Sequence, residues 1–172
     1  MISRGLSMRW LLGGAVLSVV GLACNFSGSD YNPDVQPISV PDSATFKGPA
    51  QMLIRHCGTL DCHGSNYRNF RLYGKGGRRL NPAHHPDTPE TTAEEYDADF
   101  DAVISVEPEL MSSVVQGGGA YPGVLTITRK GRGEEAHKGG APNPKGSDAD
   151  TCWTSWLKDD VDNDACTNAV AE

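Results

Sequence analysis

The sequence predicts an all-α domain, a small helical fold with long irregular loops. Apolar residues recur at helical spacing in several separate segments, and most of these segments begin at residues that favour helix N-termini. The longest interval between the segments is rich in glycine and proline. About 125 residues remain once the N-terminal segments described below are set aside, which is enough for one domain with its own core.

The first predicted helix begins near residue 46. Phe46, Ala50, Leu53, Ile54 and Cys57 fall at positions i, i+4, i+7, i+8 and i+11, which is the apolar face of an amphipathic helix. We therefore expect Cys57 to lie at the end of this helix and to face the core.

An extended loop is predicted for residues 67–89. Three glycines and three prolines interrupt any long period there. The loop carries basic residues that stand out in an acidic chain: Arg68, Arg71, Lys75, Arg78 and Arg79. These residues predict either a solvated basic face or one or two side chains that pair with an anionic group.

Two further helices follow the loop. Thr91 and Thr92, each three residues before a glutamate, form two overlapping capping boxes ahead of apolar residues at helical spacing. A third, short helix is predicted to begin at Glu107–Pro108 and to end at Gly117, because proline fits the first turn and glycine the C-terminal cap.

The last predicted helix follows Ser147. It carries Trp153, Trp156 and Leu157 on one face, which indicates core packing. Beyond it, three alternating aspartates resemble the start of a calcium loop, but Ala165 stands where that loop needs glycine and Ala171 where it needs glutamate. We expect an acidic, solvated turn instead.

The stretch Cys57-Gly-Thr-Leu-Asp-Cys62-His63-Gly64 combines two thiols with an adjacent imidazole. Covalent haem attachment needs these groups, because the two sulfurs form thioethers to the porphyrin and the histidine ligates the iron. The usual spacing is C-x2-C-H. Here it is C-x4-C-H, so two extra residues must bulge between the anchors. The motif predicts haem c attached at Cys57 and Cys62, with His63 as an iron ligand.

Two other interpretations of this motif stay open. Cys57 and Cys62 could form a disulfide that closes a small loop. Alternatively, the two thiolates and His63 could bind zinc, which takes four nitrogen or sulfur ligands. The fourth ligand would then be His56, His84 or His85.

The N-terminus predicts export. Arg4 and Arg9 precede an apolar run over residues 10–23, which is too short to span a bilayer and has the layout of a secretory signal peptide. Cleavage before Cys24 would leave either a free thiol or, as in a bacterial lipobox, a lipid-modified N-terminus. Residues 24–43 are rich in Ser, Gly, Asp and Pro and predict a flexible, lipid-anchored linker to a domain over residues 44–168.

The odd number of cysteines, five, favours the lipid anchor. Cys24 as the lipidation site, Cys57 with Cys62 as the haem pair and a Cys152–Cys166 disulfide leave no thiol over. This partition predicts a protein anchored by its lipid in the periplasm or at the outer membrane.

The charge of the chain argues against nucleic acid as a partner. Removing residues 1–23 takes two positive charges from the formal net charge of −7 and leaves −9. A chain this acidic repels a phosphate backbone.

The order of motifs resembles bacterial class I-type cytochrome c domains. An N-terminal helix leads into Cys62-His63-Gly64, then Leu125-Thr-Ile-Thr-Arg129-Lys130 leads to His137-Lys-Gly139-Gly140, and a Trp153-x-x-Trp156-Leu157 helix follows. In such relatives a His-Gly-Gly-type segment, or a methionine before the last helix, faces the haem. The resemblance implies His137 as the second axial ligand of the iron, with Met111 as the alternative.

These observations predict an extracytoplasmic monohaem electron carrier that acts between redox protein partners. No constellation of acid, base and nucleophile stands out, so we expect an electron-transfer protein and not an enzyme. The alternative from a different class is a haem-free, disulfide-stapled structural or interaction lipoprotein with a cytochrome-like fold.

Overall fold

The computed structural model describes residues 37–171. The predicted signal peptide, Cys24 and most of the predicted linker lie outside these residues. The described part is helical and contains isolated β-bridges but no strands. Its helices are η1 (Ser43–Thr45), α1 (Lys47–Cys57), α2 (Ala93–Val106), α3 (Pro108–Gln116), η2 (Pro122–Val124), α4 (Thr126–Arg132), α5 (Asp148–Trp156) and α6 (Asn163–Ala171). The all-α prediction is confirmed for this part of the chain.

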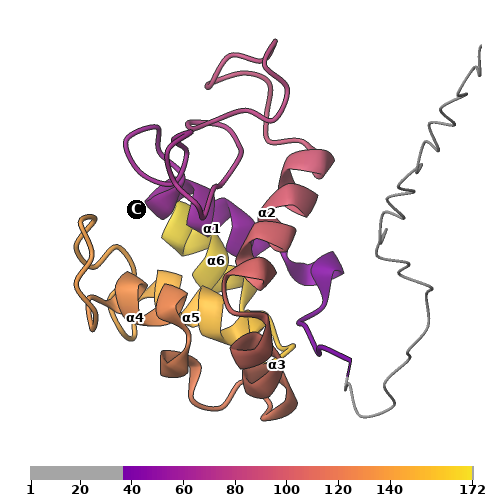
Figure 1. Cartoon of the computed structure of the whole chain (residues 1–172), viewed down its shortest axis with the longest axis vertical. Coiled ribbons are helices and arrows are strands. Elements are labelled where there is room, and N and C mark those ends of the chain that lie inside the picture. The colour runs from indigo at the N-terminus through magenta and orange to yellow at the C-terminus, as the bar shows by residue number, and fades with distance from the viewer. Residues whose placement is uncertain (1–36, 172) are drawn as a thin grey trace, which may run out of the picture. The chain divides into compact units, whose positions relative to one another are not determined.

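Helices α1, α5 and α6 form the centre of the domain. Figure 1 shows them packed together, with α2 and α3 along one side, α4 on the opposite side and the loops of residues 58–92 at one end. Within residues 37–171, no helix is both long enough and apolar enough to cross a bilayer.

Aromatic side chains from three elements fill the core. The Trp156 ring of α5 is completely buried and lies 4.8 Å from the Phe46 ring and 5.3 Å from the Trp153 ring, measured between centroids. Phe100 of α2 packs edge-on against Phe46 at 5.5 Å. The Trp153 indole donates a hydrogen bond to Thr128 Oγ1 of α4 (2.8 Å), so α4 is tied to the core by a satisfied buried pair. Trp153, Trp156 and Leu157 are core residues, as predicted.

Four helices agree with the prediction. Helix α1 ends at Cys57, α3 starts at Pro108 and ends before Gly117, and α5 is capped by Ser147, whose hydroxyl accepts from the Asp150 amide. Of the two overlapping capping boxes before α2, the structure uses Thr92 with Glu95. In these four helices the capping residues and the apolar periodicity indicate the same element, so the local sequence was sufficient to predict it.

Helices α4 and α6 were not predicted, and the expectation that α5 is the last helix is wrong. The acidic stretch after α5 leads into α6, because Asp162 caps it: the Asp162 carboxylate accepts from the Ala165 amide (2.9 Å). The solvated turn predicted there is therefore short and ends as a helix N-terminus.

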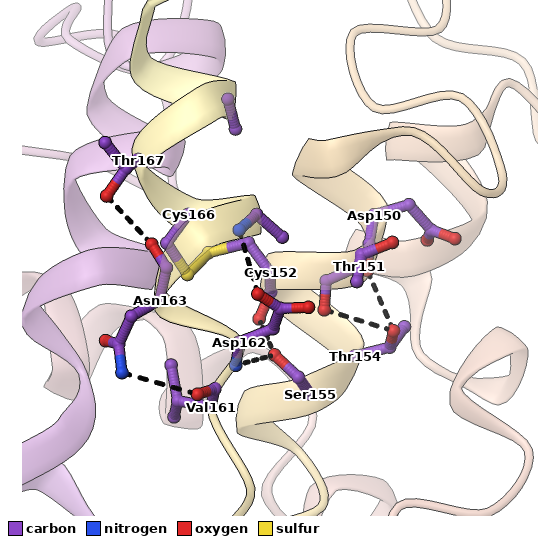
Figure 2. Close-up of a disulfide and its surroundings, with 12 residues drawn as sticks. Asp150, Thr151, Cys152, Thr154, Ser155, Val161, Asp162, Asn163, Cys166 and Thr167 are labelled. Atoms are coloured by element: carbon purple, nitrogen blue, oxygen red, sulfur yellow. Dashed lines mark hydrogen bonds between the residues drawn. A yellow bond between two sulfur atoms is a disulfide. The ribbon is translucent and has the colours of Figure 1, made fainter.

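The Cys152–Cys166 disulfide is confirmed. It joins α5 to α6, as Figure 2 shows, and both cysteines are buried. Next to it the Ser155 hydroxyl accepts from the Asp162 amide (2.9 Å) and donates to the Cys152 carbonyl (2.9 Å). Closing this loop contributes about 3 kcal/mol in the chain-entropy model.

Contacts with the helical domain begin before the predicted boundary at residue 44. The Ser39 amide donates to Ser112 Oγ (2.9 Å), and the Trp156 indole donates to the Asp42 carbonyl (3.2 Å). Residues 39–42 are thereby attached to α3 and α5.

A carboxyl group is buried where the long loop meets α2. Asp99 is completely buried; one of its oxygens accepts from the Tyr73 amide (2.7 Å), and the other has no partner. Burial raises the pKa of Asp99 to about 8, the Tyr73 amide opposes this rise, and the charge of Glu95 adds to it. Between about pH 4 and pH 8 the Asp99 carboxyl is therefore protonated in the folded protein. In the unfolded chain, where its pKa is about 3.9, the same carboxyl is ionised.

We expect Asp99 to make the domain less stable as the pH rises. Because the pKa of Asp99 is raised on folding, its contribution to the free energy of unfolding is fully present below about pH 4 and is lost progressively as the pH approaches 8. Asp99→Asn keeps an acceptor for Tyr73 and should remove most of this loss, whereas Asp101→Asn, at an exposed site on the same helix, should retain it. Urea unfolding at pH 5 and pH 8 measures the difference. An equal loss of stability in the parent and in Asp99→Asn would contradict this prediction.

Candidate functional site

The turn after α1 brings His63 back to the end of that helix. The His63 amide donates to the Cys57 carbonyl (2.9 Å), while the amides of Cys62 and Gly64 both donate to the Thr59 carbonyl (2.9 and 3.0 Å). The four residues between the cysteines thus form a compact turn. Both extra residues of the C-x4-C-H spacing are accommodated in this turn.

Two glycines allow this turn to pack. A Cβ atom on Gly64 would lie 2.2 Å from the Gly58 carbonyl oxygen, and one on Gly77 would lie 2.1 Å from the same oxygen. Any side chain at either position would force the backbone apart. The glycine that follows His63 in the motif is therefore required by packing of the turn.

Cys57 and Cys62 are both partly buried and free. The Cys57–Cys62 disulfide considered from the sequence is thus not formed in the structure. Burial raises the pKa of Cys57 to about 12, and the neighbouring Cys62 adds to that rise, so Cys57 is a protonated thiol at neutral pH.

His63 is held as a neutral imidazole. Its Nδ1 lies 2.9 Å from the Phe70 carbonyl, which can only accept, so Nδ1 carries the proton and Nε2 is left with its lone pair. Burial lowers the pKa of His63; the Phe70 hydrogen bond opposes this, and His137 and Arg68 add to the lowering. A neutral ring fixed through Nδ1 is the state in which histidine binds a metal through Nε2.

The His137 ring is stacked with the His63 ring. The two ring centroids are 5.9 Å apart and the ring planes differ by only 10°. This separation leaves both rings within reach of one bound group. His137 Nδ1 is buried without a hydrogen-bond partner. The structure therefore brings together two of the predicted ligand residues, which are 74 positions apart in the chain.

Two cavities share these histidines. One, of about 180 Å³, has mainly apolar walls that include Phe70, Val106 and Ile127, and Cys57 lies on its surface. The other, of about 460 Å³, is lined by Cys62 and by basic side chains. A volume of this size is within the range of small-molecule sites, about 300–1,000 Å³.

The basic residues of the long loop have different roles. Only Arg68 lines the larger cavity, where Lys130 and Lys138 join it. Arg79 is buried against Glu95, and Lys75 pairs with Glu90. Arg78 lies over the Tyr73 ring at 5.8 Å, and Arg71 donates to the Arg68 carbonyl. Of the five residues singled out from the sequence, Arg68 alone is placed to meet an anionic group in this cavity.

The alternative ligand residues lie elsewhere. Met111 is 1% exposed and belongs to the hydrophobic core, and it lines neither cavity. The ring nitrogens of His56 face the Pro142 and Ala169 carbonyls (2.9 and 2.7 Å). His84 and His85 lie in the long loop, where His84 is near Asn81 and His85 is exposed. Within residues 37–171, no group of three or more His, Cys, Asp or Glu side chains is arranged to bind a metal.

Several residues of the site were not predicted from the sequence. Phe70 acts through its backbone carbonyl, which has no side-chain signature. Val106, Ile127 and Asn143 come from three separate segments, and only packing brings them to one cavity. Glu135, whose carboxylate pairs with Arg129 and Lys130, carried a usable signal, because three basic residues precede it near the end of a potential helix.

No protein-family model, curated protein or solved structure matches this chain.

Proposed function

We propose that this protein is an extracytoplasmic monohaem c-type cytochrome that carries single electrons between redox proteins. In this proposal Cys57 and Cys62 would hold haem c covalently, and His63 and His137 would bind its iron. The observation that carries it is the parallel pair of imidazoles, 5.9 Å apart, beside a free cysteine and an apolar cavity.

The residues present fit the group. Attachment consumes reduced thiols, and Cys57 and Cys62 are both unbonded. Each histidine can offer one nitrogen, since His63 uses only Nδ1 in a hydrogen bond and His137 Nδ1 lacks a partner. Apolar walls suit a porphyrin face, and Arg68, Lys130 and Lys138 suit its carboxylates.

The protein contributes ligands and surroundings, and the bound haem supplies the one-electron chemistry. The neutral imidazole of His63 adds no charge to the site. A methionine ligand raises the potential of cytochromes c relative to histidine, so His137 in place of Met111 favours a lower potential. The apolar wall of the smaller cavity excludes water from the side of Cys57.

Intact mass and a reduced pyridine haemochrome spectrum of the full chain, purified from a host that matures c-type cytochromes, test this proposal. We expect a c-type α-band and the mass of one haem on a peptide that contains Cys57 and Cys62. Cys57→Ser and Cys62→Ser should each reduce the covalently retained haem. A colourless protein whose peptide containing Cys57 and Cys62 carries no added haem mass would overturn the proposal.

A further inference from the structure

His137 lies in a segment without a helix, so other contacts must determine where its ring lies. It belongs to the connection between α4 and α5, residues 133–147, and most residues from 133 to 140 are exposed. Inside the segment, the Gly140 amide donates to the His137 carbonyl (3.0 Å), which closes a local turn. Such a turn shapes the loop but does not attach it to the domain.

Glu135 attaches the loop to α4. Its two carboxylate oxygens are both used: Arg129 Nε donates to one (2.9 Å) and Lys130 Nζ lies 2.6 Å from the other. Lys130 also donates to the Ala136 carbonyl (3.2 Å), and the Glu134 amide donates to the Arg129 carbonyl (2.8 Å). The last turn of α4 therefore holds residues 134–136, immediately before His137.

Arg129 is itself held in place. Its Nη2 donates to Thr126 Oγ1 (2.9 Å), and its Nη1 donates to the Val124 carbonyl. Thr126 is bound in turn by the Glu107 carboxylate, which accepts from its amide (2.6 Å) and its hydroxyl (2.8 Å). This chain of hydrogen bonds connects Glu135 to the start of α3. The guanidinium is thus ordered before it meets Glu135, which reduces the entropy lost in forming the pair.

Gly139 leaves the space that the His137 ring occupies. A Cβ atom at this position would lie 2.9 Å from Cε1 and 3.2 Å from Nδ1 of His137. The backbone of Gly139 is not in the left-handed region, so alanine is allowed there by φ. Any effect of a methyl group at this position would therefore come from contact with the imidazole.

We propose that Glu135 and Gly139 are positioning residues that hold the His137 imidazole opposite His63. Glu135 attaches the loop to α4, and Gly139 gives the ring room to fold back over that loop. This inference rests on the proposed function where it concerns haem ligation. The attachment of the loop itself is also testable in haem-free protein.

Glu135→Gln, compared with Glu134→Gln, tests the attachment. Both substitutions remove one negative charge, but Glu134 makes no ion pair among the described residues. In haem-free protein, hydrogen exchange over residues 133–140 should be about fivefold faster in Glu135→Gln than in Glu134→Gln. In the haem protein, carbon monoxide should bind the ferrous form about fivefold faster, and 1 M salt should reduce the difference.

Gly139→Ala, compared with Gly123→Ala, tests the space for the ring. A Cβ atom on Gly123 would have no neighbour closer than 3.9 Å. We expect Gly139→Ala to lose the six-coordinate low-spin spectrum in a large fraction of the protein and to bind carbon monoxide at least about tenfold faster. Gly123→Ala should match the parent in both measurements.

The outcomes separate this inference from the proposed function. A parent protein without haem refutes the proposed function. A six-coordinate haem parent in which Glu135→Gln behaves like Glu134→Gln, and Gly139→Ala like Gly123→Ala, overturns the inference alone. A haem spectrum that His137→Ala leaves unchanged also overturns the inference, because another residue would then be the ligand.

Discussion

Replacing His63 with alanine should abolish the low-spin haem spectrum and leave the helical domain folded. His63 directly follows Cys62, and its Nδ1 is fixed by the Phe70 carbonyl, so its removal takes away the proposed iron ligand of the motif. It is not part of the buried core cluster. We expect the stability of the haem-free domain to fall by about 1 kcal/mol, the typical contribution of one hydrogen bond. Optical spectra and urea unfolding measure the two effects.

His85→Ala is the matched control for this variant. The His85 side chain is 70% exposed in the long loop, so its removal should change neither the spectrum nor the stability. Added imidazole should restore the low-spin spectrum of His63→Ala, because the cavity has room for the missing ring. Retention of the parent spectrum by His63→Ala would show that His63 does not ligate the iron.

Glu95→Gln should destabilise the domain by about 3–5 kcal/mol, the usual cost of leaving one charge of a buried pair uncompensated. The Glu95 and Arg79 side chains are 1% and 2% exposed, and Arg79 binds both carboxylate oxygens (2.9 and 2.8 Å). Glutamine keeps the size of the side chain and suits the capping box with Thr92. The loss of stability therefore comes from removal of the charge. Urea unfolding at pH 7 measures this loss.

The same pair predicts acid sensitivity. Burial raises the pKa of Glu95, but the Arg79 hydrogen bond and the amides of Thr92 and Leu80 outweigh burial and leave the pKa below its ordinary value. A carboxyl with a lowered pKa contributes stability above its unfolded pKa of about 4.3, and this contribution is lost as the pH falls through the folded pKa. Glu95→Gln should remove this part of the acid sensitivity.

Glu94→Gln serves as the control, because it changes the same charge one residue away at an exposed position. We expect its stability to differ from that of the parent by no more than about 0.5 kcal/mol. Equal stabilities for Glu94→Gln and Glu95→Gln would mean that the buried pair adds nothing to the stability of the fold.

The sequence predicted the long loop but not the contacts of Arg79 within it. The irregular composition of residues 67–89 predicted a loop, and the structure has isolated bridges there and no helix. The role of Arg79 was not predictable, because its partners are a carboxylate in α2 and the backbone carbonyls of His85, Pro89 and Glu90. Backbone acceptors leave no trace in side-chain identity, and only the folded loop brings them to one guanidinium.

The sequence by itself determined the helices whose caps and apolar periods agree, namely α1, α2, α3 and α5, together with the disulfide that cysteine parity predicted. Helix α4 begins without a side-chain cap, and the buried face of α6 consists of the small residues Ala165, Cys166 and Ala169, so neither helix has a strong local signal. Only the tertiary structure placed the two candidate ligands. Packing of α3 places Met111 in the core, whereas His137 lies near His63 in a loop whose Glu135 pairs with Arg129 of α4. The physical reason is that helix periodicity and capping are local, whereas the position of a side chain in a loop depends on contacts between residues distant in the chain.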